Sequence, residues 1–244
     1  TIGADGRNSR LAQAVQAPVY EQHEPVTCWY FSYWSDVPSD ALHVYVHNRR
    51  VIFAFPTNDG LFGLFIAWPA AELRTVRADV EGAFMTVVNG IPALAAILAD
   101  ARRAERFYGA TDLPNFLRRP FGPGWALVGD AGCHKDPYMA LGICDALRDA
   151  ELLVDAIHLG LNDGGDLAVT LAGYEQQRNA ATLEQYRQNL HLAQFKPMPP
   201  EALALRRKLQ GRTEETRRFY LANQGMVPRE GFFNPENLQR LMGM

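Results

Sequence analysis

The feature that most constrains the fold is a short apolar segment that runs into a glycine-rich turn and then a long helical pattern. Residues 125–128 predict a buried strand, and they lead directly into Gly129-Asp130-Ala131-Gly132. Helical spacing begins near Ala140 and continues to Leu161. Ligands of open α/β sheets bind at the carboxyl ends of strands, and a helix N-terminus carries free N–H groups and partial positive charge. The segment therefore predicts a strand-turn-helix unit with a ligand site at its turn.

A chemically similar turn stands at the start of the chain. Ile2-Gly3 reads as the end of a strand, Asp5-Gly6 as a turn, and Ser9 as the cap of a short helix over residues 9–15. Glycines would let the backbone approach a ligand there, although an ordinary Asp-Gly turn with a serine cap has the same residues. Because only two residues precede this turn, we expect the strand to begin upstream and the sequence to be a fragment.

The sequence between the two turns alternates between strand and helix patterns. Strand patterns cover residues 27–37, 43–47, 51–55 and 61–68, and Asp59-Gly60 is a hairpin signal, so we predict a four-stranded antiparallel meander. Helical spacing follows in residues 70–103, and a proline-containing stretch at 104–124 should hold one short strand. Further helices are predicted over residues 166–193 and after residue 200.

The long helix after the second turn has an apolar stripe, which we expect to be buried. The stripe comprises Ile143, Ala146, Leu147, Ala150, Val154, Ile157 and Leu161. The residues expected to face away are Asp145, Arg148, Asp149, Glu151 and Asp155.

Composition narrows the class of protein. The 244 residues are 48% hydrophobic and 21% charged, as in an ordinary globular protein, and the net charge of −3 gives no reason to expect nucleic acid or an anionic membrane as partner. The longest apolar run, residues 61–68, is far shorter than the roughly 18 residues of a spanning helix. Three cysteines without a CxxC pair, and no basic-then-apolar leader, predict a reducing, cytoplasmic compartment. The sequence does not indicate an oligomeric state.

The two turns together resemble the two downstream FAD motifs of flavoprotein monooxygenases of the para-hydroxybenzoate hydroxylase type. The second turn reads GDAGCHKDPYMALGICDALRDAELL and stays in register with that family's GDAxHxxxPxxGxGxxxAxxDA pattern. The aromatic strands between the turns resemble the antiparallel sheet that roofs the family's substrate pocket. The resemblance covers about residues 1–185, and flavin-dependent halogenases and geranylgeranyl-reductase-like enzymes share the scaffold.

The chain departs from the family pattern at several positions. Cys133 stands where the family has His, Ala140 replaces the first Gly of the Pro-x-x-Gly-x-Gly loop, and Ala12 replaces an Arg that closes the first motif. The upstream GxGxxG turn that grips the FAD pyrophosphate is absent from the sequence. At least one βαβ unit, on the order of 30 residues, is therefore missing from the family's full pattern.

The resemblance implies an α/β (mixed α+β) fold: the carboxyl-side part of a Rossmann-like FAD-binding domain, an inserted antiparallel substrate sheet and a helical tail. We expect residues 1–20 and 104–195 to form the incomplete FAD-binding domain, 21–103 the sheet domain and 196–244 the helical extension. The implied FAD-binding residues are Asp5, Gly6, Gly129, Asp130, Pro137, Leu141, Gly142 and Ile143. The resemblance names no catalytic residue.

The implied activity is NAD(P)H-dependent monooxygenation of a small aromatic or cyclic substrate through a flavin hydroperoxide. Tyr30, Phe53, Phe55 and Phe65 are the candidate pocket residues, although strand aromatics are more often core. Alternatives are a halogenase or reductase on the same scaffold, and a flavin-less remnant that only binds a partner or ligand. Substrate identity and the choice between NADH and NADPH stay open.

Other chemistry-bearing residues favour ordinary structural roles. His43 and His47 lie on one predicted strand, roughly 13 Å apart, so they cannot share a metal ion, and we expect no metal site. Cys133 and His134 are neighbours, which rarely face each other as nucleophile and base do. The Arg206-Arg207-Lys208 run, interleaved with glutamates further on, is typical of a solvated helix face.

Overall fold

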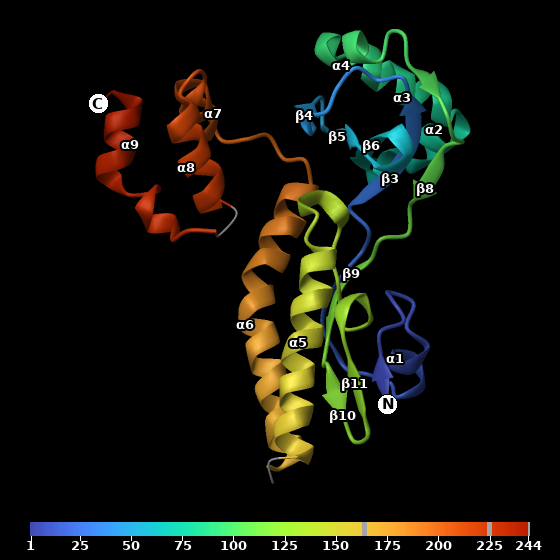
Figure 1. Ribbon diagram of the computed structural model, residues 1–244, viewed down its shortest axis with the longest axis vertical. Coiled ribbons are helices and arrows are strands. Elements are labelled where there is room, and N and C mark those ends of the chain that lie inside the picture. Colours follow the sequence, from blue (N-terminus) through green and yellow to red (C-terminus); the bar gives the residue numbers. More distant parts are fainter. Residues whose placement is uncertain (163–164, 224–225, 244) are drawn as a thin grey trace. The chain divides into compact units, whose positions relative to one another are not determined.

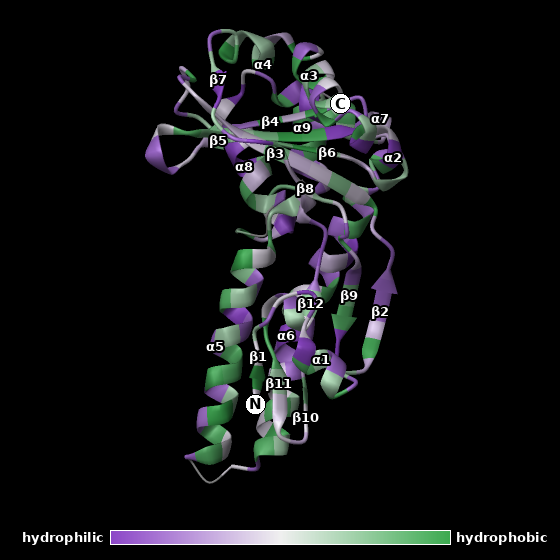
Figure 2. Cartoon of the chain, turned by 90° about the vertical axis from the view of Figure 1, so that its right-hand side faces the viewer, coloured by the Kyte–Doolittle hydropathy of each residue, from purple (hydrophilic) through white to green (hydrophobic). Residues whose placement is uncertain are grey.

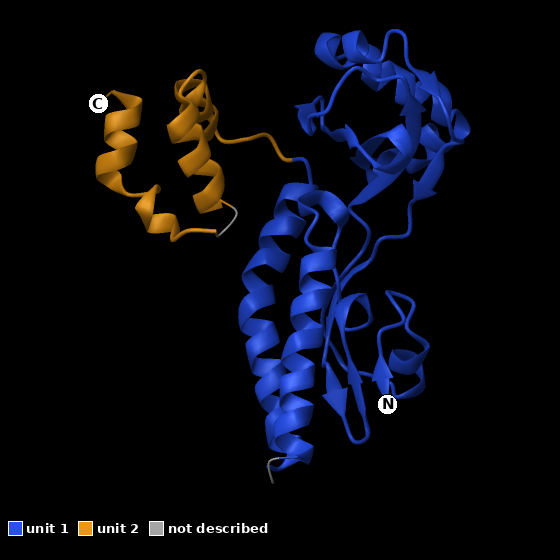
Figure 3. Ribbon diagram, viewed as in Figure 1, with its two compact units in different colours: residues 1–195 blue, residues 196–244 orange. Residues whose placement is uncertain are grey.

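The computed structural model describes residues 1–162, 165–223 and 226–243. The chain divides into two compact units, Thr1–Phe195 and Lys196–Met244 (Figure 3). The second unit consists of helices α7 (Pro200–Leu209), α8 (Thr213–Asn223) and α9 (Pro235–Met242). These helices enclose a small core of their own, formed by Leu205, Leu209, Phe219, Ala222, Phe232 and Leu241.

The first unit contains a six-stranded antiparallel sheet with the strand order β4-β5-β6-β3-β7, in which β8 also pairs with β3. Its strands are β3 (Thr27–Ser35), β4 (His43–His47), β5 (Arg50–Pro56), β6 (Phe62–Pro69), β7 (Arg102–Arg103) and β8 (Tyr108–Ala110). The predicted meander is wrong for β3, which pairs with β6 instead of β4. This places β3, which is rich in aromatic residues, inside the sheet. Asp59 and Gly60 take positive φ values of 58° and 69° in the β5–β6 turn, as the hairpin signal predicts.

The two faces of this sheet have different surroundings. Helices α2 (Leu73–Ala78), α3 (Val80–Asn89) and α4 (Pro92–Ile97) cover one face, where Trp34, Trp68 and Phe84 are buried (Figure 1). Asp79 separates α2 from α3, because its side chain accepts a hydrogen bond from the Gly82 amide and begins a new helix. The opposite face carries a row of aromatic rings. We call it the aromatic face, and it comprises Trp29, Phe31, Phe53, Phe55 and Phe65.

Two small three-stranded sheets complete the first unit. One has the order β1-β11-β10 and the other β12-β9-β2. Their strands are β1 (Ile2–Gly3), β2 (Val19–His23), β9 (Asn115–Arg118), β10 (Phe121–Gly122), β11 (Trp125–Leu127) and β12 (Cys133–His134). The stretch 104–124 thus holds more than the single strand expected, because its prolines lie between strands instead of interrupting them.

Helix α5 (Gly142–Leu161) runs beside α6 (Leu167–Ala193), and the short α1 (Arg10–Ala14) follows the first turn (Figure 1). The predicted orientation of α5 is wrong for Asp145, Asp149 and four residues of the apolar stripe, whereas Glu151 and Asp155 are exposed as expected. Asp145 and Asp149 are buried against α6, whereas the stripe residues Ile143, Leu147, Val154 and Leu161 are 78%, 68%, 65% and 64% exposed. Figure 2 shows hydrophobic residues along the outer side of α5. Cationic partners compensate the buried carboxylates, so an apolar stripe alone does not decide which side of this helix packs.

Candidate functional site

Strands β1 and β11 lie side by side and parallel, with Ile2 opposite Ala126 and Gly3 opposite Leu127. The Val128 amide also donates to the Gly3 carbonyl, 3.0 Å away. Since the carboxyl ends of parallel strands share one edge of a sheet, the turn after β1 and the turn after β11 become neighbours. The structure thus brings Asp5 and Gly6 together with Gly129 and Asp130 at one edge.

Asp5 organises the first turn. Its carboxylate Oδ2 accepts hydrogen bonds from the amides of Arg10 (2.8 Å) and Leu11 (3.3 Å), and Ser9 Oγ accepts one from the Ala12 amide (3.0 Å). The hydrogen bond from Ser9 lowers the pKa of Asp5, so the carboxylate is anionic at neutral pH. Gly6 has a φ of +76° and open space where a Cβ would stand. Ser9 therefore caps α1 as expected, Asp5 accepts from two further amides of its first turn, and the turn at Gly6 stays open.

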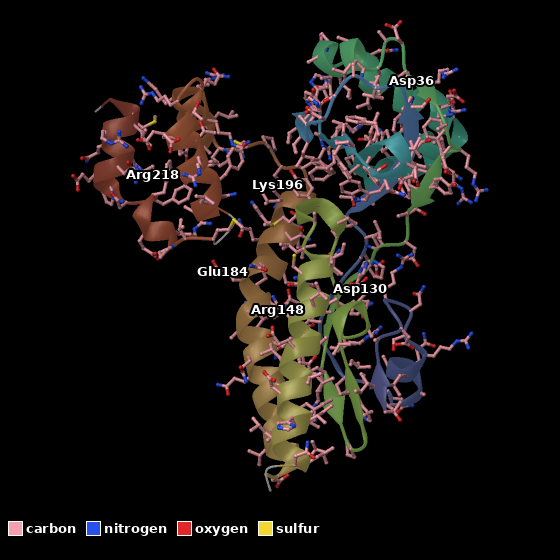
Figure 4. The ribbon with its side chains drawn as sticks, in the orientation of Figure 1. Asp36, Asp130, Arg148, Glu184, Lys196 and Arg218 are labelled. Carbon is pink, nitrogen blue, oxygen red and sulfur yellow. The ribbon has the colours of Figure 1, made fainter. Side chains whose placement is uncertain are left out.

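Gly129 and Asp130 lie in the 3-10 turn after β11. Gly129 has a φ of +57°, and a Cβ there would come within 3.0 Å of the Ala146 side chain, so the turn packs closely on α5. The Asp130 side chain is half-buried and makes no hydrogen bond or ion pair within the described parts of the chain. Figure 4 shows Asp130 beside α5.

The N-terminus of α5 opens toward the same carboxylate. No side chain caps this helix, which begins at Gly142 with Leu141 as its N-cap residue, and Gly142 and Ile143 are exposed. A Cβ on Gly142 would meet only Asp130 Oδ1, 3.9 Å away. Ala140 takes the left-handed conformation (φ 55°, ψ 36°), a backbone geometry that glycine adopts more readily than alanine does. Uncapped N–H groups and a nearby carboxylate form a cradle that fits the polar part of a flavin.

Asp136 is buried, and it anchors the loop that connects the Gly129-Asp130 turn to the N-terminus of α5. It accepts hydrogen bonds from the Thr27 hydroxyl and from the Tyr138 amide, and burial raises its pKa. Its own amide donates to Asn115 Oδ1 (2.8 Å), and its carbonyl accepts from Asn189 Nδ2 (2.9 Å). The loop is thereby tied to β3, β9 and α6, and Pro137 follows at the start of a 3-10 turn.

A buried ionic cluster holds α5 against the loop and against α6. Lys135 pairs with Asp145, and Arg148 pairs with Asp145 (2.8 Å) and with Asp149 (3.1 Å). Arg148 also donates to Thr182 Oγ1 of α6, and Figure 4 shows its side chain between the two helices. The sequence analysis missed this cluster, although the spacing of Asp145 and Arg148 is one at which helical side chains meet.

The aromatic face holds three of the four candidate pocket residues. Phe65 stacks between Phe31 (4.9 Å between ring centroids) and Phe55 (5.3 Å), and Phe53 stacks on Trp29 (5.9 Å). The side chain of Tyr138, from the loop before α5, joins the same cluster beside Phe195. The aromatic face therefore continues to the loop.

The assignment of Tyr30 to the pocket is wrong. Successive strand residues point to opposite faces, and Tyr30 packs edge-on to Trp68 under the helices, 6.2 Å between centroids. Its neighbours Trp29 and Phe31 lie on the aromatic face. The alternation of side chains along β3 therefore predicts that Trp29 and Phe31, and not Tyr30, share a face with Phe53, Phe55 and Phe65.

The remaining cysteine and histidine side chains have structural contacts. Burial raises the pKa of Cys133 to about 11, and the imidazole of His134 bonds to the carbonyl of Pro114. The imidazoles of His43 and His47 contact Ser39 and Asn48. Among the described residues, no group of three or more His, Cys, Asp or Glu side chains converges as metal ligands would.

Comparisons with known proteins agree with this geometry. No protein-family model matches the chain. A curated relative, the FAD-dependent urate hydroxylase of Klebsiella oxytoca, is 31% identical over 146 residues, which are 58% of this chain and 36% of the hydroxylase. The chain thus spans about a third of the length of that relative.

Two solved structures show the same fold. PqsL of Pseudomonas aeruginosa, described as a probable FAD-dependent monooxygenase, is 24% identical with a TM-score of 0.67, over 79% of this chain and 54% of PqsL. The myxobacterial chondrochloren halogenase CndH is 17% identical with a TM-score of 0.69, over 99% of this chain and 61% of CndH.

These findings confirm the resemblance and the fold predicted from the sequence. The fold is the mixed α/β fold seen in solved FAD-dependent monooxygenases and halogenases. Within the described ranges, no helix has the length and apolar character needed to cross a bilayer.

Proposed function

We propose that this chain forms part of an FAD-dependent monooxygenase that hydroxylates a small aromatic or cyclic substrate with NAD(P)H as co-substrate. The observation that carries the proposal is the open cradle of Asp130 and the uncapped α5 N-terminus, next to the Asp5-Gly6 turn. The hydroxylase activity named for the curated relative supports the reaction class. Bound flavin would supply the redox chemistry that activates oxygen.

The chain's own residues would bind and orient the cofactor. Asp130 would accept hydrogen bonds from hydroxyl groups of the ribityl chain, and the backbone at Leu141, Gly142 and Ile143 would donate to the pyrimidine edge of the flavin ring. A helix N-terminus stabilises negative charge that develops at that edge. Gly6 would leave room for the pyrophosphate, while Asp5 keeps the turn in shape.

The aromatic face would complete the substrate side of the site. Phe53 and Tyr138 lie where this face meets the loop before α5, so an apolar ring held there would be shielded from water. We propose that the FAD-binding part is built mainly from residues 1–20 and 104–195 and the substrate sheet mainly from residues 21–103. Strands β2 and β8 cross these bounds, because β2 pairs with β9 and β8 pairs with β3. Three free thiols support a reducing, cytoplasmic location, and the charge of −3 supports a small-molecule partner over nucleic acid or membrane.

A halogenase is the second candidate, because a solved halogenase shares the fold at a TM-score of 0.69. Halide ions separate the two proposals. A hydroxylase would turn over its substrate without chloride or bromide, whereas a halogenase would require one of them and incorporate it into the product.

The first experiment is a titration of the 244-residue chain with FAD, followed by flavin absorbance and fluorescence. We expect saturable 1:1 binding with a shifted flavin spectrum, and an Asp130→Asn variant that binds about tenfold more weakly because a charge-assisted hydrogen bond is lost. Asp155→Asn is the matched control, since Asp155 lies on the exposed side of the same helix. Absence of binding, or equal weakening by both variants, would contradict the proposed site.

A further inference from the structure

Four aromatic rings on four neighbouring strands form a continuous stack across the large sheet. The order is Tyr108 (β8), Phe31 (β3), Phe65 (β6) and Phe55 (β5), with centroid separations of 5.5, 4.9 and 5.3 Å and interplanar angles of 22°, 18° and 3°. Tyr33 stands edge-on to Phe31 and Phe65, at 89° and 86°. Stacked and edge-on rings hold one another in place, so this aromatic stack is a rigid apolar wall.

A cavity of about 500 Å³ opens beside the stack. Its walls include the rings of Phe31, Tyr33 and Tyr108, and its polar rim includes Thr57, Asp59 and Glu105. Among the described residues that line the cavity, none is Lys, Arg or His. The lining therefore combines an aromatic wall with two carboxylates, and Arg106, which lies against the Tyr108 ring, is outside the lining.

The cavity is separate from the cradle near Asp130. Strand β3 meets the loop before α5 at Thr27, which bonds to Asp136, and reaches the cavity at Tyr33. The cavity wall begins at Phe31, four residues of extended strand or roughly 13 Å from Thr27, and Tyr33 lies roughly 20 Å from Thr27. A ligand in the cavity would not overlap a flavin bound at the α5 N-terminus.

The hydrogen bonds at the rim leave carboxylate oxygens for a ligand. Tyr108 donates its hydroxyl hydrogen to Glu105 Oε2 (2.5 Å), and Asn58 Nδ2 donates to Asp59 Oδ2 (2.7 Å). Each of these carboxylates has a second oxygen that can accept from a ligand. The Arg106 guanidinium lies 5.0 Å from the Tyr108 ring centroid, so the Tyr108 ring already makes one cation–π contact.

We infer that this cavity is a binding site for a small aromatic ligand with a positively charged amino group. The ligand's ring packs against Phe31, Tyr33 and Tyr108, and its ammonium group lies between Asp59 and Glu105. The same carboxylates repel aromatic acids. The site needs no flavin, so it stands independently of the proposed monooxygenase activity.

The test uses calorimetric titration of the full chain at low salt with three probes. Tyramine carries both ring and ammonium group, 4-hydroxyphenylacetate carries the ring with the opposite charge, and butylamine carries the ammonium group alone. We expect tyramine to bind about tenfold tighter than either of the others, from the combined effect of two exposed carboxylates and ring contact.

Variants identify the cavity as the place of binding. The double variant Asp59→Asn/Glu105→Gln should remove the preference for tyramine over 4-hydroxyphenylacetate, and Phe31→Leu should weaken the binding of tyramine. Asp40→Asn, an exposed carboxylate of the same sheet region, should change nothing. Thermal unfolding curves check that each variant is folded.

Three results would overturn the inference: no tyramine binding, equal binding of the three probes, or the same loss in the Asp40 control as in the double variant. Displacement of tyramine by FAD would overturn the separation of the two sites. Tyramine binding without FAD binding would leave this inference standing while the proposed function fails, so the two failures are distinguishable.

Discussion

Thr27, the first residue of β3, donates its hydroxyl hydrogen to the buried carboxylate of Asp136, in the loop that leads into α5. These residues are 109 positions apart in the sequence, and Thr27 also accepts a hydrogen bond from the Trp29 indole, 2.8 Å away. A chain of buried polar contacts thus connects the aromatic face to the loop that shapes the α5 N-terminus. These contacts therefore tie β3 of the large sheet to the loop before α5.

Replacing Asp136 tests that connection. Asp136→Ala leaves the Thr27 hydroxyl and the Tyr138 amide without their acceptor, so we expect the free energy of unfolding to fall by about 2–3 kcal/mol. Chemical denaturation measures this change. A loss below 0.5 kcal/mol, the size usual for surface substitutions, would contradict the contacts described.

The pH dependence of Asp136 has a definite sign. Burial raises its pKa above 3.8, so the folded chain binds this proton more readily than the unfolded chain does. The residue therefore adds to the free energy of unfolding as pH falls toward 3.8, and that contribution is lost as pH rises through the raised pKa. Asp136→Asn should remove this slope, measured as the difference between wild type and variant from pH 7 to pH 4. An unchanged slope would show that other groups produce it.

Ala140→Gly should stabilise the chain. Ala140 has a left-handed backbone, which costs an alanine about 1 kcal/mol and costs glycine little. We expect a higher denaturation midpoint in urea for this variant. The matched control, Ala172→Gly in the exposed part of α6, should instead lower the free energy of unfolding by a similar amount. If both variants shifted stability in the same direction, the left-handed assignment would be wrong.

The pair of Lys135 and Asp145 should show strong coupling. Asp145→Asn leaves the buried Lys135 ammonium without its partner, and we expect a loss of about 3–5 kcal/mol. The double variant Lys135→Met/Asp145→Leu removes both charges and should recover most of that stability. A double-mutant cycle measures the coupling, and additive effects would exclude a direct buried pair.

The side of α5 that packs can be tested with two leucines. Leu147 is 68% exposed and Leu153 is 2% exposed. Leu147→Gln should change the free energy of unfolding by less than about 0.5 kcal/mol, whereas Leu153→Ala should lower it by about 2–5 kcal/mol. A larger loss for Leu147→Gln than for Leu153→Ala would instead indicate that the apolar stripe is the buried side of α5.

The sequence predicted most of the elements of the sheet and both turns, because alternation, an Asp-Gly hairpin and glycine turns are local signals. It did not predict that β3 would pair with β6, since that pairing depends on contacts between distant residues. It also placed Asp145 and Asp149 in solvent, because hydrophobic periodicity carries no information about Lys135 and Arg148 as buried partners. At the candidate site, the motif located Asp130 and Gly142, whereas the anchoring role of Asp136 required the structure.

The pairing of β1 with β11 also has a consequence for the order of folding. The Ala126 amide donates to the Thr1 carbonyl (2.9 Å), so this contact closes a very long loop. The hairpins β4–β5 and β5–β6 close short loops and have a much smaller entropic cost. We therefore expect the aromatic sheet to form early and the two turns to meet late. Under native conditions, backbone amides at Leu127 and Val128 should then exchange with solvent faster than those at Ile52 and Leu64.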